Sequence, residues 1–316
     1  MDNAIIINDN ESNKESEAFT KVIKNDEGDA LGTSLPMGKN IIAKMPVSID
    51  SECYNMEHKH RGHAIIFNHK TFNVSQLKER HGTDVDGNNL ENILKNLGFK
   101  VAICHDYKFK DMYKVLEDLA SMDHTDNDCI IVSILSHGEM GTIYAKDTPY
   151  KLDSLLGMFT ADRCPTLAGK PKIFFIQACQ GDQLDEGVTL SNRTETDGSA
   201  YSYRIPSQAD FLIAYSTIPG YYSWRNTTNG SWFMQALCNE LQLNGKTRDL
   251  LTLLTFVCRR VATDFESNTP DSIIMHRKKQ IPCITSMLTR LVFFPKKLHG
   301  QKLEIKKNPL KMFYNK

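Results

Sequence analysis

Two side chains that can act together as nucleophile and base each follow an apolar segment of the sequence. His137 comes after the segment 129–135 (CIIVSIL), and Cys179 comes after the segment 172–177 (KIFFIQ). They are 179 − 137 = 42 residues apart, with one helical pattern between them. A thiolate is a strong nucleophile, and an imidazole can take the thiol proton and later give it to a leaving amine. The pair therefore predicts nucleophilic catalysis at the ends of two neighbouring strands.

The backbone next to both residues is suited to binding a reacting group. Gly138 directly follows His137, and Gly181 lies two residues after Cys179. Glycine allows another chain to approach closely, so we expect a substrate to lie against both positions. The backbone N–H groups of Gly138 and Cys179 are candidates to bind a developing oxyanion. The alternative is a core cysteine and a structural histidine, which are common when each is considered alone.

The cysteine pattern does not favour a metal site or a disulfide framework. The eight cysteines, at positions 53, 104, 129, 164, 179, 238, 258 and 283, contain no C-x-x-C pair, and most lie in apolar segments. The histidine-rich stretch 58–63 (HKHRGH) has no cysteine or carboxylate cluster beside it, whereas a closed zinc site needs four ligands. We expect no metal and no cofactor.

Composition limits the classes of partner. The chain has 316 residues, of which 41% are hydrophobic and 24% charged, with zero formal net charge and a pI near 7.1. These values fit a globular protein and give no general attraction to nucleic acid or to an anionic membrane. No segment is apolar over the length of a membrane span, and the N-terminal AIIIN is too short for a signal peptide. We expect a cytoplasmic protein that binds neither nucleic acid nor membrane.

The elements that must position His137 and Cys179 read as an α/β fold. Continuous apolar runs at 63–69, 99–104, 129–135 and 172–178 are typical of buried parallel strands. Helical patterns at 83–98, 108–122 and 151–159 alternate with them, the first with Thr83 as its expected cap and Gly98 at its end. Such alternation predicts a sheet with helices on both faces, and reactive side chains collect at the carboxyl ends of its strands.

The rest of the chain continues this pattern after a polar break. Residues 187–209 read as a loop or linker, followed by a strand at 210–216, helices at 230–245 and 248–265, and a strand-like segment at 286–294. Residues 1 to about 45 are polar and are expected to be disordered. The tail from Lys296 has seven lysines and one glutamate, and we expect a solvated tail rather than a nucleic-acid patch.

Five motifs give the chain a specific resemblance to a known family. They are RHGTDVDGNNL at 80–90, SHGE at 136–139, QACQG at 177–181, YYSWRNTTNGSWF at 221–233 and KKQIPCITSMLTR at 278–290. In this order and spacing they resemble the caspases, over about Tyr54 to Phe294. The resemblance implies a caspase-like sandwich, with a central, mostly parallel six-stranded sheet and helices on both faces. The short N-terminal segment is similar to that of executioner caspases, here of the invertebrate effector type.

Caspases cleave peptide bonds after aspartate, and the resemblance implies which residues recognise that side chain. The matching primary-pocket positions are Arg80, Gln177 and Arg225, and two guanidiniums can bind one carboxylate through charge-assisted bonds that lysine would not reproduce. A glutamate has one more methylene and would leave buried donors unpaired. The further substrate-binding positions implied by the family are Tyr222, Ser223, Trp224, Asn226 and Trp232. Asn226 matches a subsite for an acidic side chain.

Two departures from the family pattern affect the periphery of this site. Gln180 replaces the commoner arginine after the nucleophile and removes a charge but no catalytic atom. The segment 267–276 (SNTPDSIIMH) replaces a loop that is rich in phenylalanine in some relatives, so preference at the outer subsites is left open.

The sequence also contains candidate sites for its own cleavage. Asp197 ends TETD within the polar linker, and Asp29 ends DEGD in the N-terminal segment, both in contexts accessible to proteases. We expect a zymogen with a pro-segment at 1–29, a large subunit at 30–197 and a small subunit at 198–316. Residues 30–316 together would form one catalytic domain.

The resemblance implies several partners. They are protein substrates cleaved after aspartate, a second large and small subunit pair in a homodimer, and an upstream initiator caspase. Cleavage after Asp29 would expose an N-terminal Ala30, which is similar to the peptides captured by inhibitor-of-apoptosis proteins.

Two other classes of protein are alternatives to a protease. A catalytically silent caspase-like scaffold normally lacks the cysteine, the histidine or the pocket arginines, and all are present here. An unrelated nucleotide-binding enzyme would need a phosphate loop, but the segment 244–247 (NGKT) has Glu240 where the earlier glycine is required.

Overall fold

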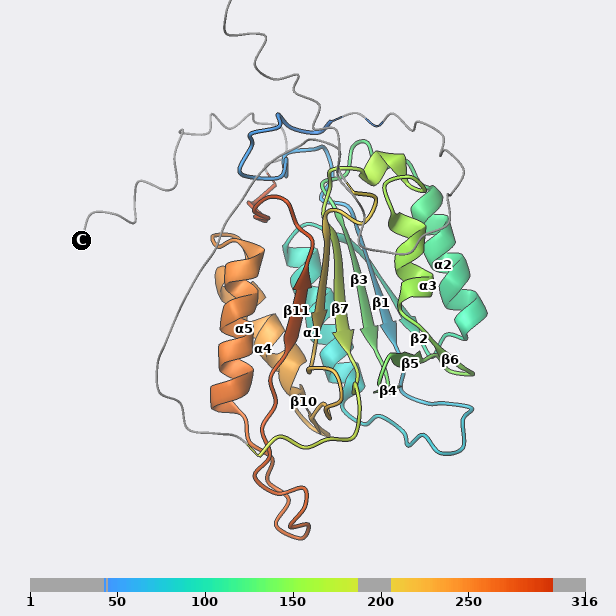
Figure 1. Ribbon diagram of the computed structural model, residues 1–316, viewed down its shortest axis with the longest axis vertical. Helices are drawn as coiled ribbons and strands as arrows, with labels where there is room; N and C mark the ends of the chain where they lie inside the picture. The colour runs from blue at the N-terminus through green and yellow to red at the C-terminus, as the bar shows by residue number, and fades with distance from the viewer. Residues whose placement is uncertain (1–42, 44, 187–205, 298–316) are drawn as a thin grey trace, which may run out of the picture. The chain divides into compact units, whose positions relative to one another are not determined.

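A six-stranded sheet forms the centre of the computed structural model, which describes residues 43, 45–186 and 206–297 (Figure 1). The strand order is β11-β8-β7-β3-β1-β2, and every neighbouring pair is parallel except β11 with β8. This confirms the predicted mostly parallel sheet. The strands are β1 (His63–Asn68), β2 (Lys100–His105), β3 (Ile130–Leu135), β7 (Lys172–Gln177), β8 (Phe211–Tyr215) and β11 (Cys283–Ser286).

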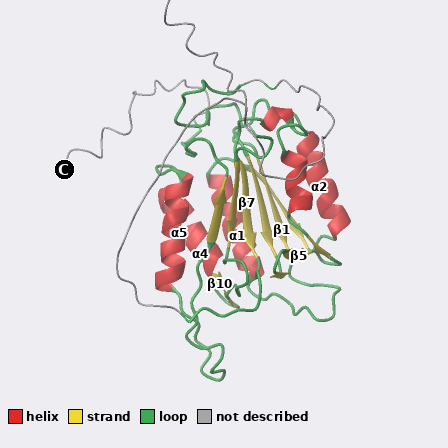
Figure 2. Ribbon diagram, viewed as in Figure 1, coloured by secondary structure: helices red, strands yellow, loops and turns green. Residues whose placement is uncertain are grey.

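Helices cover both faces of this sheet, as the alternating pattern predicts (Figure 2). On one face lie α1 (Thr83–Asn96), α4 (Trp232–Asn244) and α5 (Leu250–Asp264). On the other lie α2 (Phe109–Ser121), α3 (Asp153–Leu156) and the short 3-10 helix Gly157–Phe159, with a second 3-10 helix at Pro165–Leu167. Because the central strands are buried on both sides, their sequences are continuously apolar rather than alternating.

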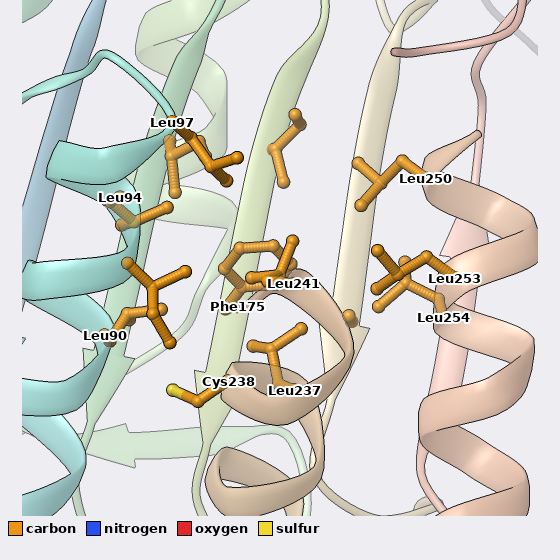
Figure 3. Close-up of a cluster of buried hydrophobic side chains, with 14 of the residues drawn as sticks. Leu90, Leu94, Leu97, Phe175, Leu237, Cys238, Leu241, Leu250, Leu253 and Leu254 are labelled. Atoms are coloured by element: carbon orange, nitrogen blue, oxygen red, sulfur yellow. The ribbon is translucent and has the colours of Figure 1, made fainter. Parts of the chain in front are cut away.

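The core joins parts of the chain that lie on opposite sides of the polar break at 187–205. Figure 3 shows Leu90 of α1 and Phe175 of β7 beside Leu237 of α4 and Leu254 of α5, and all four are fully buried. Burying one such side chain contributes about 1.5–3 kcal/mol. The segments before and after the break therefore share one hydrophobic core.

Two small sheets lie where the main strands end. One contains β4 (Gly138–Glu139), β5 (Thr142–Tyr144) and β6 (Pro149–Tyr150), and it begins directly after His137. The other pairs β9 (Arg225–Asn226) with β10 (Gly230–Ser231). The first carries a candidate oxyanion donor and the second carries a candidate pocket arginine, so both belong to the functional edge of the fold.

Two local predictions are wrong. The last strand is Cys283–Ser286, not 286–294, because the later apolar residues Val292 and Phe294 are buried in the helix-covered core without joining the sheet. Thr83 is the first residue of α1 rather than its cap. Its hydroxyl donates to Asn68 Oδ1, 2.7 Å away, while Gly82 with φ 83° precedes the helix.

Several predicted features lie outside the described residues. They are the N-terminal segment with Asp29 and Ala30, the linker residue Asp197, and nearly all of the basic tail. Within the described ranges, no helix is long and apolar enough to cross a membrane.

Candidate active site

The register of β3 and β7 aligns His137 with Cys179. Leu135 pairs with Gln177 at the ends of these parallel strands, and each candidate catalytic residue follows its strand end by two positions. The chains stay close beyond the strands, since a Cβ on Gly138 would lie 2.5 Å from the carbonyl oxygen of Cys179. Real Cβ atoms do not approach so closely, so only glycine permits this packing. The predicted convergence of the two segments is confirmed.

His137 is held as a neutral imidazole with a defined tautomer. Its Nε2 lies 2.8 Å from the backbone oxygen of Lys78, and a carbonyl oxygen can only accept, so Nε2 carries the proton. The Nδ1 atom therefore keeps a lone pair. The pKa of His137 is lowered to about 4, mainly by burial and also by the charges of Arg80 and Arg225, while the Lys78 contact acts in the opposite direction. The ring of Phe72 packs at 4.9 Å between centroids and limits rotation.

Cys179 is a partly buried thiol that contacts Ser223. The backbone N–H of Ser223 donates to Sγ over 3.4 Å. Burial raises the pKa of the Cys179 thiol, while the Ser223 contact and the charges of Arg80 and Arg225 lower it. Because burial is the largest of these effects, the resting residue at neutral pH is a thiol and needs a base before it attacks.

The two glycines of this region have different neighbours. Gly138 packs against Cys179, the candidate nucleophile, and the Cys179 N–H donates to no backbone carbonyl within the described ranges. At Gly181 the close neighbour is the chain itself, because a Cβ there would lie 2.2 Å from the carbonyl oxygen of Gly220. Gly181 therefore joins two loops of the site, whereas the sequence suggested that a substrate would lie against it.

Arg80 and Gln177 are both buried and both have spare polar atoms. The Arg80 Nη1 donates to the backbone oxygen of His69 over 2.7 Å and to the Thr83 hydroxyl over 2.6 Å, whereas its Nε and Nη2 have no partner. Gln177 Nε2 donates to Ser223 Oγ over 2.8 Å, and its Oε1 is unpartnered. An unsatisfied buried donor costs about 1–3 kcal/mol, so the two unpartnered nitrogens of Arg80 point to a bound anion.

Arg225 lies near Arg80 and adds a second positive charge. Its Nε donates to the backbone oxygen of His81 over 2.9 Å. Burial lowers the pKa of Arg80 to about 9, and the positive charge of Arg225 contributes to this shift. Burial also lowers the pKa of Arg225. Two partly desolvated guanidiniums that repel each other would gain from one shared carboxylate.

The predicted aromatic residues form a row that leads away from the nucleophile. Ring centroids are 5.2 Å apart for Tyr222 and Trp224, 5.5 Å for Trp224 and Trp232, and 5.6 Å for Trp232 and Phe265. The loop that follows Phe265 extends past the carboxyl ends of the strands (Figure 1). The row therefore offers apolar walls beside Cys179, the candidate nucleophile, and farther out.

The side chain of Asn226 braces its own turn. Its Oδ1 accepts from the backbone N–H of Thr228 over 2.8 Å and of Asn229 over 2.9 Å. Only its Nδ2 is left to meet a ligand, as a donor suited to an acidic side chain.

Sequence reasoning missed several residues of this region. They are Lys78, whose carbonyl orients His137; Phe72, which packs on it; Gln280, which accepts from the Trp224 N–H over 2.6 Å; and Asp86, which binds Ser231. Backbone contacts such as that of Lys78 leave no signal in residue type. Gln280 lies in KKQIPC, part of the motif at 278–290 quoted above, and this was the signal available in the sequence; the structure shows that Gln280 is buried.

The histidine-rich segment surrounds a buried carboxylate rather than forming a cluster of metal ligands. Arg61 Nη1 lies 2.9 Å from Asp128 Oδ2, His58 Nδ1 lies 3.2 Å from Oδ1, and Lys297 Nζ lies 2.6 Å from Oδ2. In the part of the chain that the structure describes, no group of three or more His, Cys, Asp or Glu side chains could hold a metal ion.

A cavity of about 310 Å³ adjoins Cys179, lined among others by Thr142, Leu152, Ile176 and Tyr215. Neither Arg80 nor Arg225 lines it. Cys179 therefore borders a cavity that the two arginines do not line.

Comparisons with known proteins agree with this geometry. A family model described as "Caspase domain" matches residues 61–293. The chain is 63% identical over 273 residues to Caspase-1 of Spodoptera frugiperda, covering 86% of this chain and 91% of that protein. It is 62% identical over 258 residues to Caspase drICE of Drosophila melanogaster, covering 81% and 76%. The crystal structure of the Spodoptera frugiperda Caspase-1 is similar with a TM-score of 0.77 at 60% identity, covering 83% of this chain and 100% of that one.

Proposed function

The chain belongs to the caspase family as an effector caspase of the invertebrate type, and we propose that Cys179 is its nucleophile and His137 its general acid and base. It is an aspartate-specific cysteine endopeptidase that acts in apoptosis by cleaving cellular proteins after aspartate.

The proposed reaction uses the neutral pair in two steps. Nδ1 of His137 takes the thiol proton as Sγ of Cys179 attacks the carbonyl carbon, and the N–H groups of Gly138 and Cys179 bind the oxyanion. The intermediate then expels the amine, which receives the proton from the imidazolium and leaves a thioester. Water attacks the thioester, giving a proton to Nδ1, and the thiol is regenerated with the acid product.

The proposed specificity pocket consists of Arg80, Gln177 and Arg225. The unpartnered Nε and Nη2 of Arg80, together with the guanidinium of Arg225, would bind the two oxygens of the substrate aspartate. If the Ser223 hydroxyl donates to Gln177 Oε1, the amide turns Nε2 toward the ligand with the same heavy-atom positions. Tyr222, Trp224 and Trp232 would contact apolar side chains before the aspartate, and Asn226 an acidic side chain at the fourth position.

One observation carries this proposal: Ser223 connects the nucleophile with the pocket. Its N–H contacts Cys179 Sγ, and its Oγ contacts Gln177. An aspartate side chain in the pocket would therefore hold its own carbonyl carbon beside the sulfur. Such positioning is a large part of catalysis, because it removes the entropic cost of bringing the groups together.

The proposal is tested with peptides that differ only in a terminal Asp, Glu or Asn before the cleaved bond. Linker-cleaved protein should hydrolyse the Asp peptide at least about 100-fold faster than the others, as expected when mismatched ligands leave buried donors unpaired. Cys179→Ala should be inactive, and Arg80→Lys and Arg225→Lys should raise KM. Equal cleavage of the three peptides would reject the pocket, and an active Cys179→Ala variant would reject the nucleophile.

Maturation is proposed to follow cleavage after Asp197 and Asp29, both outside the described residues. The loop that leads into the linker is bonded to the site: Lys278 Nζ donates to Glu186 Oε1 over 2.5 Å, and Tyr222 N donates to Gln183 O over 2.9 Å. Cutting the linker would free this loop to rearrange. The subunits 30–197 and 198–316 would remain associated through the β7–β8 pair and the shared core.

These cleavage steps make separate predictions. Asp197→Ala should stay a single chain with low activity, and an Asp197→Ala chain with full activity would reject the first cut. An upstream initiator caspase is the proposed activating partner, and it should cut the inactive Cys179→Ala chain after Asp197.

Two further partners are proposed. A homodimer would form at the edge strand β11, which pairs only with β8 within the described sheet; sedimentation that gives only the mass of one large and small subunit pair would reject it. Inhibitor-of-apoptosis proteins would capture a new N-terminal Ala30, and equal binding after deletion of residues 30–33 would reject that contact.

A cytoplasmic location is proposed as well, and fractionation of cells that express the tagged chain tests it.

A further inference from the structure

Asp86 is a buried carboxylate close to the proposed pocket, without any role in the reaction described above. It lies in the first turn of α1 and is 2% exposed. An acidic residue there would be expected only to favour the helix N-terminus. Its oxygens instead bind the small sheet: Ser231 N donates to Oδ1 over 2.8 Å, and Ser231 Oγ donates to Oδ2 over 2.6 Å.

The Asp86–Ser231 contact connects the two pocket arginines through the backbone. Ser231 of β10 pairs with Arg225 of β9, so the carboxylate holds the strand next to that arginine. Arg80 lies six residues before Asp86, in the turn that leads into α1, and donates to Thr83 of the same helix. Asp86 thus links the two backbone segments that carry the arginines.

The packing around this contact is tight enough to transmit position. A Cβ on Gly230, with φ 89°, would lie 2.2 Å from Asp86 Oδ1. A Cβ on Gly82 would lie 2.6 Å from the backbone oxygen of Asn226, so the turn before α1 also touches β9. Both glycines allow the helix start and the small sheet to approach each other closely.

Asp86 also supplies charge to the pocket. Besides its bonds to Ser231 on β10, it interacts electrostatically with Arg225 on β9, with Arg80 before α1 and with Cys238 on α4. Its negative charge raises the pKa values of both arginines, which burial lowers. Burial raises the pKa of Asp86 itself to about 6, against the Ser231 bonds and the two arginines.

We propose that Asp86 is a positioning residue for substrate specificity, which sets Arg225 relative to Arg80 through Ser231 before the substrate binds. This inference rests on the proposed pocket. It predicts that a carboxylate of the enzyme, that of Asp86, positions the pocket for the carboxylate of the substrate aspartate. After cleavage of the linker, the contact would join the large subunit to the small one.

The test is Asp86→Asn in the linker-cleaved enzyme. Charge-assisted hydrogen bonds of this kind correspond to about a 10- to 100-fold effect, so KM for the Asp peptide should rise by about that factor while kcat changes little. The preference for Asp over Glu should fall. In the parent enzyme kcat/KM should decline as pH drops through about 6, when Asp86 takes up a proton, and this step should be missing in Asp86→Asn.

Asp249→Asn is the matched control. Asp249 is another buried carboxylate that accepts two backbone bonds, from Thr252 N over 3.1 Å and Val292 N over 3.0 Å, but it caps α5 away from the pocket. It should keep the parental KM and pH profile, even if stability falls. Ser231→Ala keeps the carboxylate and should raise KM by about 3- to 10-fold, so it tests the contact if Asp86→Asn does not fold.

The outcomes separate this inference from the pocket proposal. Parental KM and pH profile in Asp86→Asn, or in Ser231→Ala if the first variant does not fold, overturn the role of Asp86 while Arg80→Lys and Arg225→Lys still raise KM. If those arginine variants also behave like the parent, the pocket itself is wrong. A raised KM in Asp249→Asn equal to that in Asp86→Asn would show that general destabilisation causes the effect, which also overturns the inference.

Discussion

The backbone oxygen of Lys78 lies 2.8 Å from Nε2 of His137 and thereby fixes which imidazole nitrogen is free to act as a base. The contact precedes any substrate. Since it comes from a carbonyl, no substitution at position 78 removes it directly, and the loop that carries Lys78 also carries Arg80. One segment therefore positions both the proposed base and an arginine of the proposed specificity pocket.

We first predict that His137 titrates well below an ordinary histidine. Burial and the two arginines lower its pKa to about 4, so the imidazole is neutral and basic above that pH and is lost as a base only when pH falls through about 4. The His137 ring signals in NMR, assigned with His137→Asn, should move near pH 4. Titration near 6.5, the ordinary pKa of histidine, would contradict this account of the base.

A second prediction concerns the reactivity of the resting thiol. Because burial raises the pKa of Cys179, alkylation by iodoacetamide should be slow at pH 7 and accelerate as the pH rises above the ordinary thiol value. The rate at this site is the difference between the parent and Cys179→Ala, followed by mass spectrometry. A fast rate that is already constant below pH 7 would indicate a preformed thiolate instead.

Gly138→Ala should remove most of the catalytic rate. The added Cβ would lie 2.5 Å from the carbonyl oxygen of Cys179 and push apart the two segments that supply the oxyanion donors. Loss of one such donor costs about 10²- to 10³-fold in kcat, with little change in KM. Gly157→Ala is the control, because its Cβ would meet only Arg163 Nη1 at 3.8 Å. A Gly138→Ala enzyme with kcat within about 3-fold of the parent would exclude this role.

The pocket should weaken at alkaline pH. Burial and Arg225 lower the pKa of Arg80 to about 9, and the guanidinium is charged below that value. KM for the Asp peptide should therefore rise as pH increases through about 9, before a normal arginine would lose its proton. If KM in stopped assays stays constant up to pH 11, Arg80 keeps its proton throughout.

Much of this arrangement was predictable from the sequence, because strand ends and register follow from apolar runs. The apolar runs before His137 and Cys179 form the paired strands β3 and β7. Because His137 and Cys179 each follow the end of their strand by two residues, the two segments lie together. The apolar run at 286–294 was wrongly predicted as a strand, because segments buried against helices contain the same residue types as buried strands. The role of Asp86 could not be predicted, because nothing local in its sequence reveals a partner 145 residues away.

The most direct test of the central claim is covalent trapping of the nucleophile. A peptide halomethyl ketone ending in aspartate should alkylate linker-cleaved protein once per chain, at Cys179. Peptide mapping by mass spectrometry identifies the labelled residue. The analogue ending in asparagine should react far more slowly, and Arg80→Lys should slow the aspartate reagent. Labelling at another cysteine, or equal rates with both reagents, would contradict a mechanism in which Cys179 attacks beside a pocket for aspartate.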